Sequence, residues 1–225
     1  SMMESFKNIV IIAPHPDDET LGLGGSIKKF IKNKVKVSIL VVSGHLPPLY
    51  NKKDFILTKK ESIKAFKFLG VKDYKFLEIP ATKVNEVPVS ELNHMIYSFI
   101  NKRKPDTVFA PFPDRHIDHR IIFDSTMVAC RPIKKSSPKN VLLYETLSET
   151  HWNASNVEPM FNPNFFINID DTLNDKIKTL KLYKSQISNK TPSRSIEAVQ
   201  ALSKFRGSQN GCKYAEAFQL IRMVI

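Results

Sequence analysis

Short apolar runs alternate along this chain with segments whose apolar side chains recur at helical spacing. The run at 8–13 is followed by a segment, 20–33, that carries Leu23, Ile27 and Phe30 on one helix face. Further strands are predicted at 35–43, 73–77, 107–110, 141–144 and 165–169, and further helices at 57–69, 88–102, 118–129, 172–184 and 195–205. Because parallel strands are joined by helical crossovers, this alternation predicts an α/β fold with a doubly wound, mostly parallel sheet and helices on both faces.

Length and composition favour one globular unit. The chain has 225 residues, and its 42% hydrophobic fraction supports a core that needs no disulfides. No linker or repeat divides the sequence, so residues 1–225 are expected to form a single domain. Apolar runs such as 9–13 are far shorter than the roughly 20 residues that span a bilayer, and no transmembrane helix is expected. Cys130 and Cys212 lack CxxC spacing and indicate reduced thiols in a cytoplasmic compartment.

The charge of the chain is strongly basic. Lys and Arg number 34 against 22 Asp and Glu, for a formal net charge of +12, and 27 of the 34 are Lys. Specific recognition of nucleic acid relies on Arg forks and interleaved aromatic residues, whereas dispersed Lys is typical of a solvated surface. No nucleic-acid partner is therefore expected.

Three carboxylates and an imidazole crowd the turn after the first predicted strand. Residues 13–19 read Ala-Pro-His-Pro-Asp-Asp-Glu and include His15, Asp17, Asp18 and Glu19. Adjacent carboxylates repel one another in a low-dielectric pocket, so a divalent cation among them is the simplest interpretation. The alternative is a polar loop in which an acidic side chain caps the following helix.

A second polar segment follows the strand predicted at 107–110, just as the first follows the strand at 8–13. It reads Pro-Asp-Arg-His-Ile-Asp-His over 113–119 and contributes His116 and His119. The first and fourth strands of a doubly wound sheet are usually neighbours where ligands bind, so the two loops are expected to meet. Two His and one Asp, with a pair of ligands from the first loop and one from the second, suit Zn²⁺ or Fe²⁺ with open positions.

The two segments resemble the motifs of the PIG-L/LmbE-like N-acetylglucosaminyl deacetylases. The family's first motif, AHPDDE, corresponds to residues 13–19, with Pro14 as a departure, and its second, HxDH, corresponds to 116–119. The stretch from Ser195 to Phe218 is similar to the tails of family members, so the resemblance covers nearly the whole chain, although the middle matches only in pattern. It implies a Rossmann-like fold and metal-dependent hydrolysis of the acetamide of an N-acetylglucosamine-type sugar.

Carried over position by position, the resemblance also implies residue roles. The metal ligands would be His15, Asp18 and His119, with Zn²⁺ as the expected ion and Fe²⁺ as the alternative. Asp17 would be the general base for a metal-activated water, and His116 would be its protonated partner. Asp118 would orient His116 and raise the pKa of that imidazole by opposite charge.

Other motifs are excluded by their spacing. Residues 22–27 begin like a dinucleotide-binding fingerprint, but Ile27 stands where the third glycine is needed. Their glycines are instead expected to let the first helix pack closely on the sheet. No GxxxxGK[ST] loop or GxSxG elbow is present. Two alternatives remain: another metal-dependent amidase or phosphoesterase, and a non-catalytic, metal-stabilised binding protein.

The expected partner is a small acetylated amino-sugar conjugate, which includes lipid-linked and nucleotide-linked sugars. Peripheral contact with a membrane is compatible with the sequence, and the motifs carry no information on oligomeric state. Loops 44–55 and 151–164 are expected to set specificity. His45 could line the pocket, although a lone loop His more often faces solvent. In the family, a basic residue that helps to bind substrate often precedes the Glu corresponding to Glu61 by three positions. Thr58 stands there in this chain.

Overall fold

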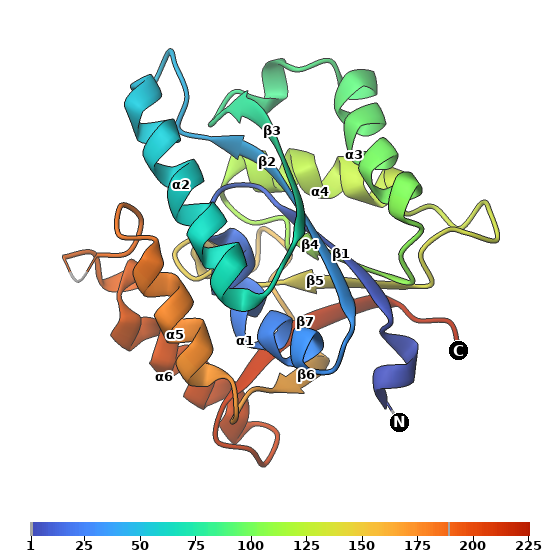
Figure 1. Cartoon of the computed structure of the whole chain (residues 1–225), viewed down its shortest axis with the longest axis vertical. Coiled ribbons are helices and arrows are strands. Elements are labelled where there is room, and N and C mark those ends of the chain that lie inside the picture. Colours follow the sequence, from blue (N-terminus) through green and yellow to red (C-terminus); the bar gives the residue numbers. More distant parts are fainter. Residues whose placement is uncertain (1, 189) are drawn as a thin grey trace.

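The structure, a computed structural model, describes residues 2–188 and 190–225. Its strands are β1 (Asn8–Ala13), β2 (Lys36–Gly44), β3 (Asp73–Pro80), β4 (Thr107–Pro111), β5 (Asn140–Tyr144), β6 (Phe165–Asn168) and β7 (Ala215–Arg222). They form one sheet in the order β3-β2-β1-β4-β5-β7-β6 (Figure 1). β1 to β5 pair in parallel, whereas β7 is antiparallel to both β5 and β6. The predicted doubly wound, mostly parallel sheet is confirmed.

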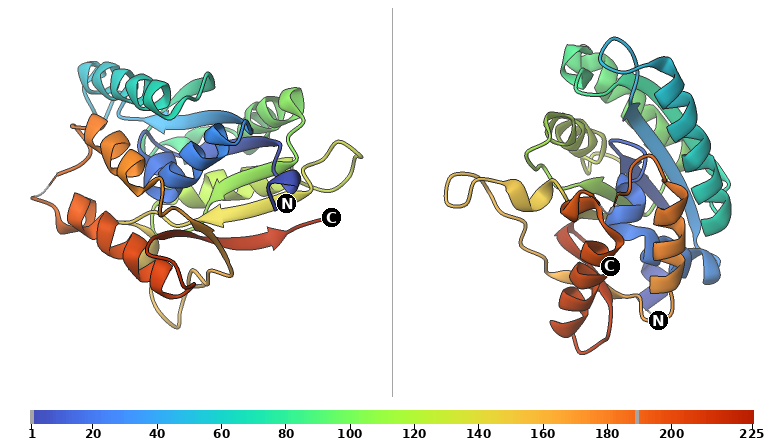
Figure 2. Two further views of the ribbon diagram at one scale, coloured as in Figure 1. Left: turned by 60° about the horizontal axis from the view of Figure 1, so that its bottom comes forward. Right: turned by 90° about the vertical axis from the view of Figure 1, so that its left-hand side faces the viewer.

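Helices cover both faces of this sheet. In the described residues the α-helices are α1 (Asp18–Lys32), α2 (Lys52–Leu69), α3 (Val89–Arg103), α4 (Ile117–Ala129), α5 (Leu173–Leu182) and α6 (Ile196–Ser208). α1, α2 and α5 pack together on one face, and α3 and α4 on the other (Figure 2). Ile9 and Ile11 of β1 join the core under α1 and α2, while Val10 and Ile12 join the core under α3 and α4. A strand buried on both faces explains the continuous apolar run in the sequence.

The C-terminal part differs most from the predicted elements. β7 was not predicted as a strand, yet it lies between β5 and β6 and buries Ala217 and Phe218. Its pairing partners are distant in sequence, so no local sequence pattern predicts this strand. α2 also begins at Lys52, earlier than predicted, because Asn51 and Asp54 form a capping box at its start.

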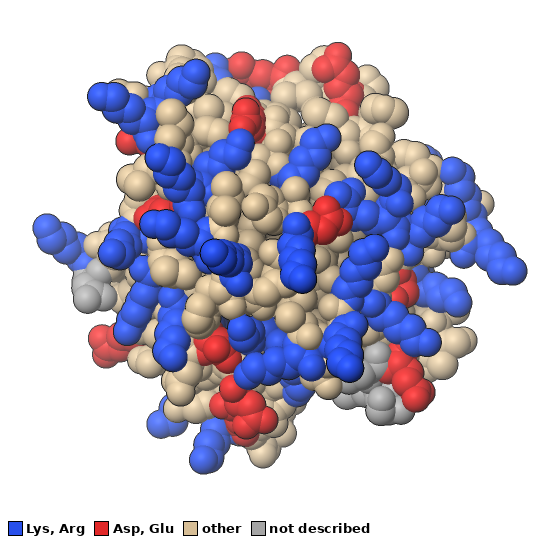
Figure 3. Space-filling view, viewed as in Figure 1, with Lys and Arg blue, Asp and Glu red and all other residues tan. Residues whose placement is uncertain are grey.

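The basic surplus lies on the outside of the molecule. Figure 3 shows Lys and Arg side chains scattered over the visible face, with Asp and Glu between them. This distribution is that of a solvated surface. Within the part of the chain that the structure describes, no helix has both the length and the apolar composition needed to cross a membrane.

The β1 strand lies between β2 and β4 and sets the position of the site. The expected neighbourhood of the first and fourth strands is thereby confirmed. The chain continues from β1 to β2 on one side and from β4 to β5 on the other, so the loops that follow β1 and β4 border a crevice at the carboxyl ends of these strands.

Close packing of α1 on the sheet depends on a glycine. A Cβ atom at Gly22 would lie 2.3 Å from Cδ2 of Tyr144, whose hydroxyl donates a hydrogen bond to the Ile12 carbonyl. A Cβ atom at Gly25 would lie 2.9 Å from a methyl group of Ile169. The prediction that these glycines permit the approach of the first helix is confirmed.

Gly22→Ala is expected to lower the free energy of unfolding by about 1–3 kcal/mol, because the buried Tyr144 ring must move to admit a methyl group. Denaturant unfolding followed by circular dichroism measures this change. Lys32→Ala, at an exposed position of α1, is the control and should change the free energy by less than about 0.5 kcal/mol. Equal free energies of unfolding for Gly22→Ala and the unaltered protein would show that the close approach of residue 22 to the Tyr144 ring does not affect stability.

Candidate active site

The six predicted site residues lie together at the carboxyl ends of β1 and β4. His15, Asp17 and Asp18 come from the turn into α1, and His116, Asp118 and His119 come from the turn into α4. The ring centroids of the three imidazoles are 4.5, 4.9 and 5.5 Å apart. Residues separated by about one hundred positions thus form one cluster.

The Asp18 carboxylate links the two loops most closely. Its Oδ2 lies 3.1 Å from Nε2 of His119 and 3.3 Å from Nδ1 of His15. Ligand atoms about 2.0–2.2 Å from a tetrahedral ion are separated by roughly 3.3–3.6 Å, so the spacing of Asp18 from each imidazole is close to that of two ligands of one ion. His15, His116 and His119 form a second candidate group, whose ligand atoms lie within 4.8 Å of one another.

Buried carboxylates make positive charge favourable here. Asp17, Asp18 and Asp118 are each at most 2% exposed. Burial opposes charge on an imidazole, yet the hydrogen bonds to Asp118 and Asp18 raise the pKa of His15. A divalent cation would compensate the same carboxylates, so the donor chemistry of the site fits Zn²⁺ or Fe²⁺.

Asp114 belongs to the site, although the sequence analysis gave it no role. Its Oδ2 is 2.9 Å from Nδ1 of His119 and accepts a hydrogen bond from the Thr150 hydroxyl. Burial opposes protonation of His119, but Asp18 and Asp114 raise the pKa of this imidazole well above its usual value. A carboxylate on Nδ1 leaves Nε2 facing Asp18, which is how metal-binding imidazoles are commonly oriented. The sequence feature that could have indicated this role is the position of Asp114 inside the second motif loop.

Asp118 contacts a different imidazole from the one expected. Its Oδ2 accepts hydrogen bonds from Nε2 of His15 at 2.8 Å and from the backbone N–H of Thr82 at 2.9 Å. Nδ1 of His116 is 3.9 Å from the same oxygen, beyond hydrogen-bonding distance. The geometry therefore makes Asp118 a partner of His15 rather than of His116.

The electrostatics of the site favour a neutral His116 imidazole, which accepts a backbone hydrogen bond. The backbone N–H of Asp118 donates to its Nδ1 at 3.1 Å, which places the proton of the neutral ring on Nε2. Burial, followed by the positive charges of His15 and His119, lowers the pKa of His116 to about 4. The rise in pKa expected from Asp118 is not found, because burial and the two neighbouring imidazoles outweigh that carboxylate.

Asp17 has a strained backbone and a buried side chain. Its φ of +93° lies in the left-handed region, and its side chain is 2% exposed. Such conformations cost about 1–3 kcal/mol in residues other than glycine and cluster at functional sites. Burial raises the pKa of Asp17 well above its usual value, while Arg194, whose Nη1 is 3.3 Å from Oδ2, opposes the shift. Asp17 is thus a buried carboxylate with an increased affinity for protons.

The site opens onto a cavity of about 210 Å³. Its described lining beyond the two motifs comes from loops that are distant in sequence: His45, Tyr50, Ala81, Thr82, Glu149, Gln186 and Arg194. The His45 and Tyr50 rings stack at a centroid distance of 4.2 Å, and both line the cavity. Of the two positions that the sequence left open for His45, the structure favours the pocket lining. Burial, with His15 and Arg194 adding to it, lowers the pKa of His45. These residues carry no motif, and only the tertiary structure brings them together.

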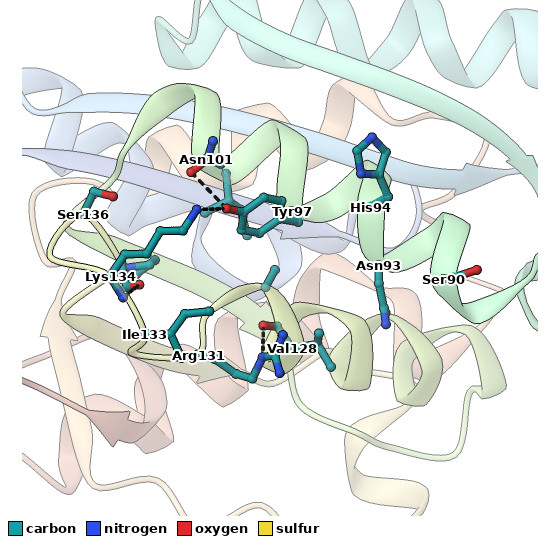
Figure 4. A pocket seen from close by; sticks show the side chains of 14 residues that line it. Ser90, Asn93, His94, Tyr97, Asn101, Val128, Arg131, Ile133, Lys134 and Ser136 are labelled. Atoms are coloured by element: carbon teal, nitrogen blue, oxygen red, sulfur yellow. Dashed lines mark hydrogen bonds between the residues drawn. The ribbon is translucent and has the colours of Figure 1, made fainter.

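A larger cavity of about 450 Å³ lies between α3 and the segment after α4 (Figure 4). Tyr97 and Lys134 approach each other across it, and Ile100 and Ala129 are buried beneath it. Its lining among the described residues contains no Asp or Glu and none of the motif residues. The cluster of titratable groups therefore lies at the smaller cavity.

The chain is similar to several known proteins. Residues 10–130 match the PIG-L family, described as GlcNAc-PI de-N-acetylase. The chain is 26% identical to the diacetylchitobiose deacetylase of Thermococcus kodakarensis in a match that covers 96% of this chain and 83% of that protein.

Two solved structures share the fold. The N,N'-diacetylchitobiose deacetylase of Pyrococcus horikoshii has a TM-score of 0.79 and 24% identity, and the match covers 98% of this chain and 85% of that one. The 4-carboxy-2-hydroxymuconate hydratase of Pseudomonas putida KT2440 has a TM-score of 0.77 and 14% identity, with 98% of each chain covered. The family match spans both motif loops and more than half of the sequence, and the chain therefore belongs to the PIG-L family of de-N-acetylases.

Proposed function

We propose that this protein is a metal-dependent deacetylase that hydrolyses the acetamide of an N-acetylglucosamine-type sugar conjugate and releases acetate. The observation that carries this proposal is the contact of the Asp18 carboxylate with both His15 and His119, beside the buried carboxylate of Asp17. Membership of a de-N-acetylase family and similarity to a diacetylchitobiose deacetylase support the same reaction.

In this proposal, His15, Asp18 and His119 hold the metal ion. Asp18 lies 3.1 and 3.3 Å from the two imidazoles, which supports this set, and the three imidazoles are the alternative group of ligands. Two nitrogen ligands and one oxygen ligand suit Zn²⁺, with Fe²⁺ as the alternative. When bound, the ion would lower the pKa of a water and polarise the acetamide carbonyl.

Asp17 is the proposed general base. It takes a proton from the attacking water and then gives that proton to the nitrogen of the leaving amine. A carboxylate with a raised pKa performs both transfers better than an ordinary one, because its pKa lies nearer to neutral pH. The strained backbone of Asp17 directs its side chain toward the cavity that would hold the acetamide.

His116 is the proposed donor to the developing oxyanion. Its Nε2 carries the proton of the neutral imidazole, and His116 lines the cavity. A neutral N–H placed in advance can stabilise the negative charge that forms on the acetamide oxygen. Asp118 and Asp114 then act through His15 and His119, whose ring orientations they hold.

The alternatives differ in what they require of the site. A two-metal phosphoesterase needs a second ion, so one ion per chain would favour amide hydrolysis. A binding protein would hold its metal without releasing acetate. The hydratase that shares the fold adds water to its substrate and releases no acid, which makes acetate release the decisive assay.

The cytoplasm is the proposed location of the protein. Cys130 is buried and Cys212 is half-buried, and both are free thiols. Burial raises the pKa of the Cys130 thiol to about 12, so this side chain stays protonated and unreactive. Free cysteines are typical of a reducing compartment.

Asp18→Asn removes a charged metal ligand. Loss of a residue that only hydrogen-bonds to a ligand typically lowers metal affinity by about 10- to 100-fold, and Asp18→Asn should lower it by more than that. His116→Gln should leave the affinity close to that of the unaltered protein. Competition with a chelator, together with elemental analysis for one ion per chain, measures both effects. A larger loss in His116→Gln than in Asp18→Asn would instead identify the three imidazoles as the ligands.

Asp114→Asn should weaken metal binding by about 10- to 100-fold, because His119 loses the carboxylate that fixes its tautomer. The same chelator competition measures this effect. Asp124→Asn, an exposed position on α4, is the matched control and should bind metal like the unaltered protein. An unchanged affinity in Asp114→Asn would exclude a supporting role for this carboxylate.

Asp17→Asn should lower kcat for acetate release by about 100-fold or more, as is typical when a general base is removed. The metal content should stay at one ion per chain, because Asp17 is not a proposed ligand. Acetate is measured with N,N'-diacetylchitobiose and other N-acetylglucosamine conjugates as substrates, again with Asp124→Asn as the control. Full activity of Asp17→Asn would remove this residue from the mechanism.

A further inference from the structure

The cavity beside Asp17 has an unusual balance of charge. Its described lining includes three carboxylates, those of Asp17, Asp18 and Glu149, and Arg194 is the one Lys or Arg among these residues. A divalent cation held by the motif residues would bring the lining close to neutrality. None of the Lys side chains lines the described part of the cavity, so none can pair directly with an anionic group inside it.

Arg194 keeps most of its donors free for a ligand. It ends the short 3₁₀ helix η4 (Pro192–Arg194), and its Nη1 is 3.3 Å from Oδ2 of Asp17. Among the described residues, Asp17 is the one side chain to which this guanidinium donates. The side chain is 28% exposed. A guanidinium presents five N–H groups in a planar fork, which matches a pair of neighbouring oxygen atoms.

A stacked pair of rings lines another part of the same cavity. His45 and Tyr50 lie in the loop between β2 and α2, and their planes are inclined by 26°. The Tyr50 ring is 37% exposed. The face of an aromatic ring is electron-rich and attracts the weakly positive C–H groups of a sugar ring. Arg194 lies close enough to His45 to lower the pKa of that imidazole, so both features belong to one region.

We propose that Arg194 and the Tyr50–His45 pair form a sugar-binding subsite that selects neutral acetylated glycans over sugars with a phosphate or carboxylate beside the acetamide. The Arg194 fork donates to neighbouring hydroxyl oxygens, and the sugar ring packs on Tyr50. The divalent cation and Arg194 would balance the charges of Asp17, Asp18 and Glu149, so no positive charge would be left over to compensate a phosphate on the sugar. The proposal of this subsite rests on the proposed deacetylase function, and it specifies neutral acetylated glycans as the class of substrate.

Steady-state kinetics of acetate release test the selectivity. We expect the unaltered enzyme to prefer N,N'-diacetylchitobiose to N-acetylglucosamine 1-phosphate by about tenfold or more in kcat/KM. Arg194→Gln should raise KM for the disaccharide about 10- to 100-fold, because charge-assisted hydrogen bonds to the sugar are lost. Arg194→Lys, which keeps the charge but not the fork, should recover only part of this loss.

Two further variants test the aromatic platform and provide a control. Tyr50→Ala should raise KM for the disaccharide, and Tyr50→Phe, which keeps the ring, should not. Arg115→Gln removes an exposed guanidinium that pairs with Glu158 outside the cavity, and it should leave both parameters unchanged. A fall in kcat with unchanged KM in Arg194→Gln would mean that Arg194 acts only through Asp17, and it would overturn the subsite. Preference for the phosphorylated sugar would overturn it as well.

Calorimetric binding of the disaccharide separates the subsite from the reaction. It uses the zinc-loaded Asp17→Asn variant, in which turnover is blocked, with and without Arg194→Gln. Release of acetate by the unaltered enzyme together with equal affinity in the two variants would overturn the subsite and leave the deacetylase in place. Absence of acetate together with weaker binding in Arg194→Gln would overturn the deacetylase and leave the subsite in place. Circular dichroism and thermal unfolding verify that each variant is folded.

Discussion

The parallel pairing of β1 with β4 brings two polar loops to the same edge of the sheet, and the candidate active site depends on this contact. Ile9, Val10 and Ile11 pair with Thr107, Val108 and Phe109, so the two strands run side by side and end together. Neither loop is sufficient alone. The first supplies adjacent carboxylates that repel one another, and the second supplies two imidazoles that hold charge weakly when buried. Only their juxtaposition gives Asp18 a partner on each loop and makes a cation favourable between them.

Burial explains why so many side chains around the site are paired. A buried charge is costly unless a partner or a hydrogen bond compensates it. Behind the site, the Tyr183 hydroxyl of the segment after α5 donates to Glu19, and burial raises the pKa of Glu19 to about 7. Lys176 of α5 pairs with Glu216 of β7 and also donates to the Leu21 carbonyl of α1. The C-terminal elements thus brace the first helix, in addition to supplying Arg194 to the cavity.

The spacing of apolar residues predicted those helices and strands whose buried faces are visible in their own sequence. Residues 9–13 of β1 are apolar because both faces of the strand are covered, and α1 carries Leu23, Ile27 and Phe30 at helical spacing because these side chains belong to the core. β7 was missed because its partners, β5 and β6, lie far away in sequence. The six motif residues were predicted to meet, and they do. The role expected of Asp118 differed, because the backbone N–H of Asp118 occupies Nδ1 of His116 and its carboxylate reaches His15 instead.

The sequence by itself determined the fold class, through alternating periodicity, and the inventory of candidate metal ligands, through residue types at matching positions after two strands. It also carried the resemblance that pointed to amide hydrolysis. The tertiary structure decided which imidazole pairs with which carboxylate, that His116 is neutral, and that Arg194, His45 and Tyr50 share a cavity with Asp17. The physical reason is that periodicity and residue type are local properties, whereas a pKa, a tautomer and a cavity wall depend on burial and on groups that only folding brings near.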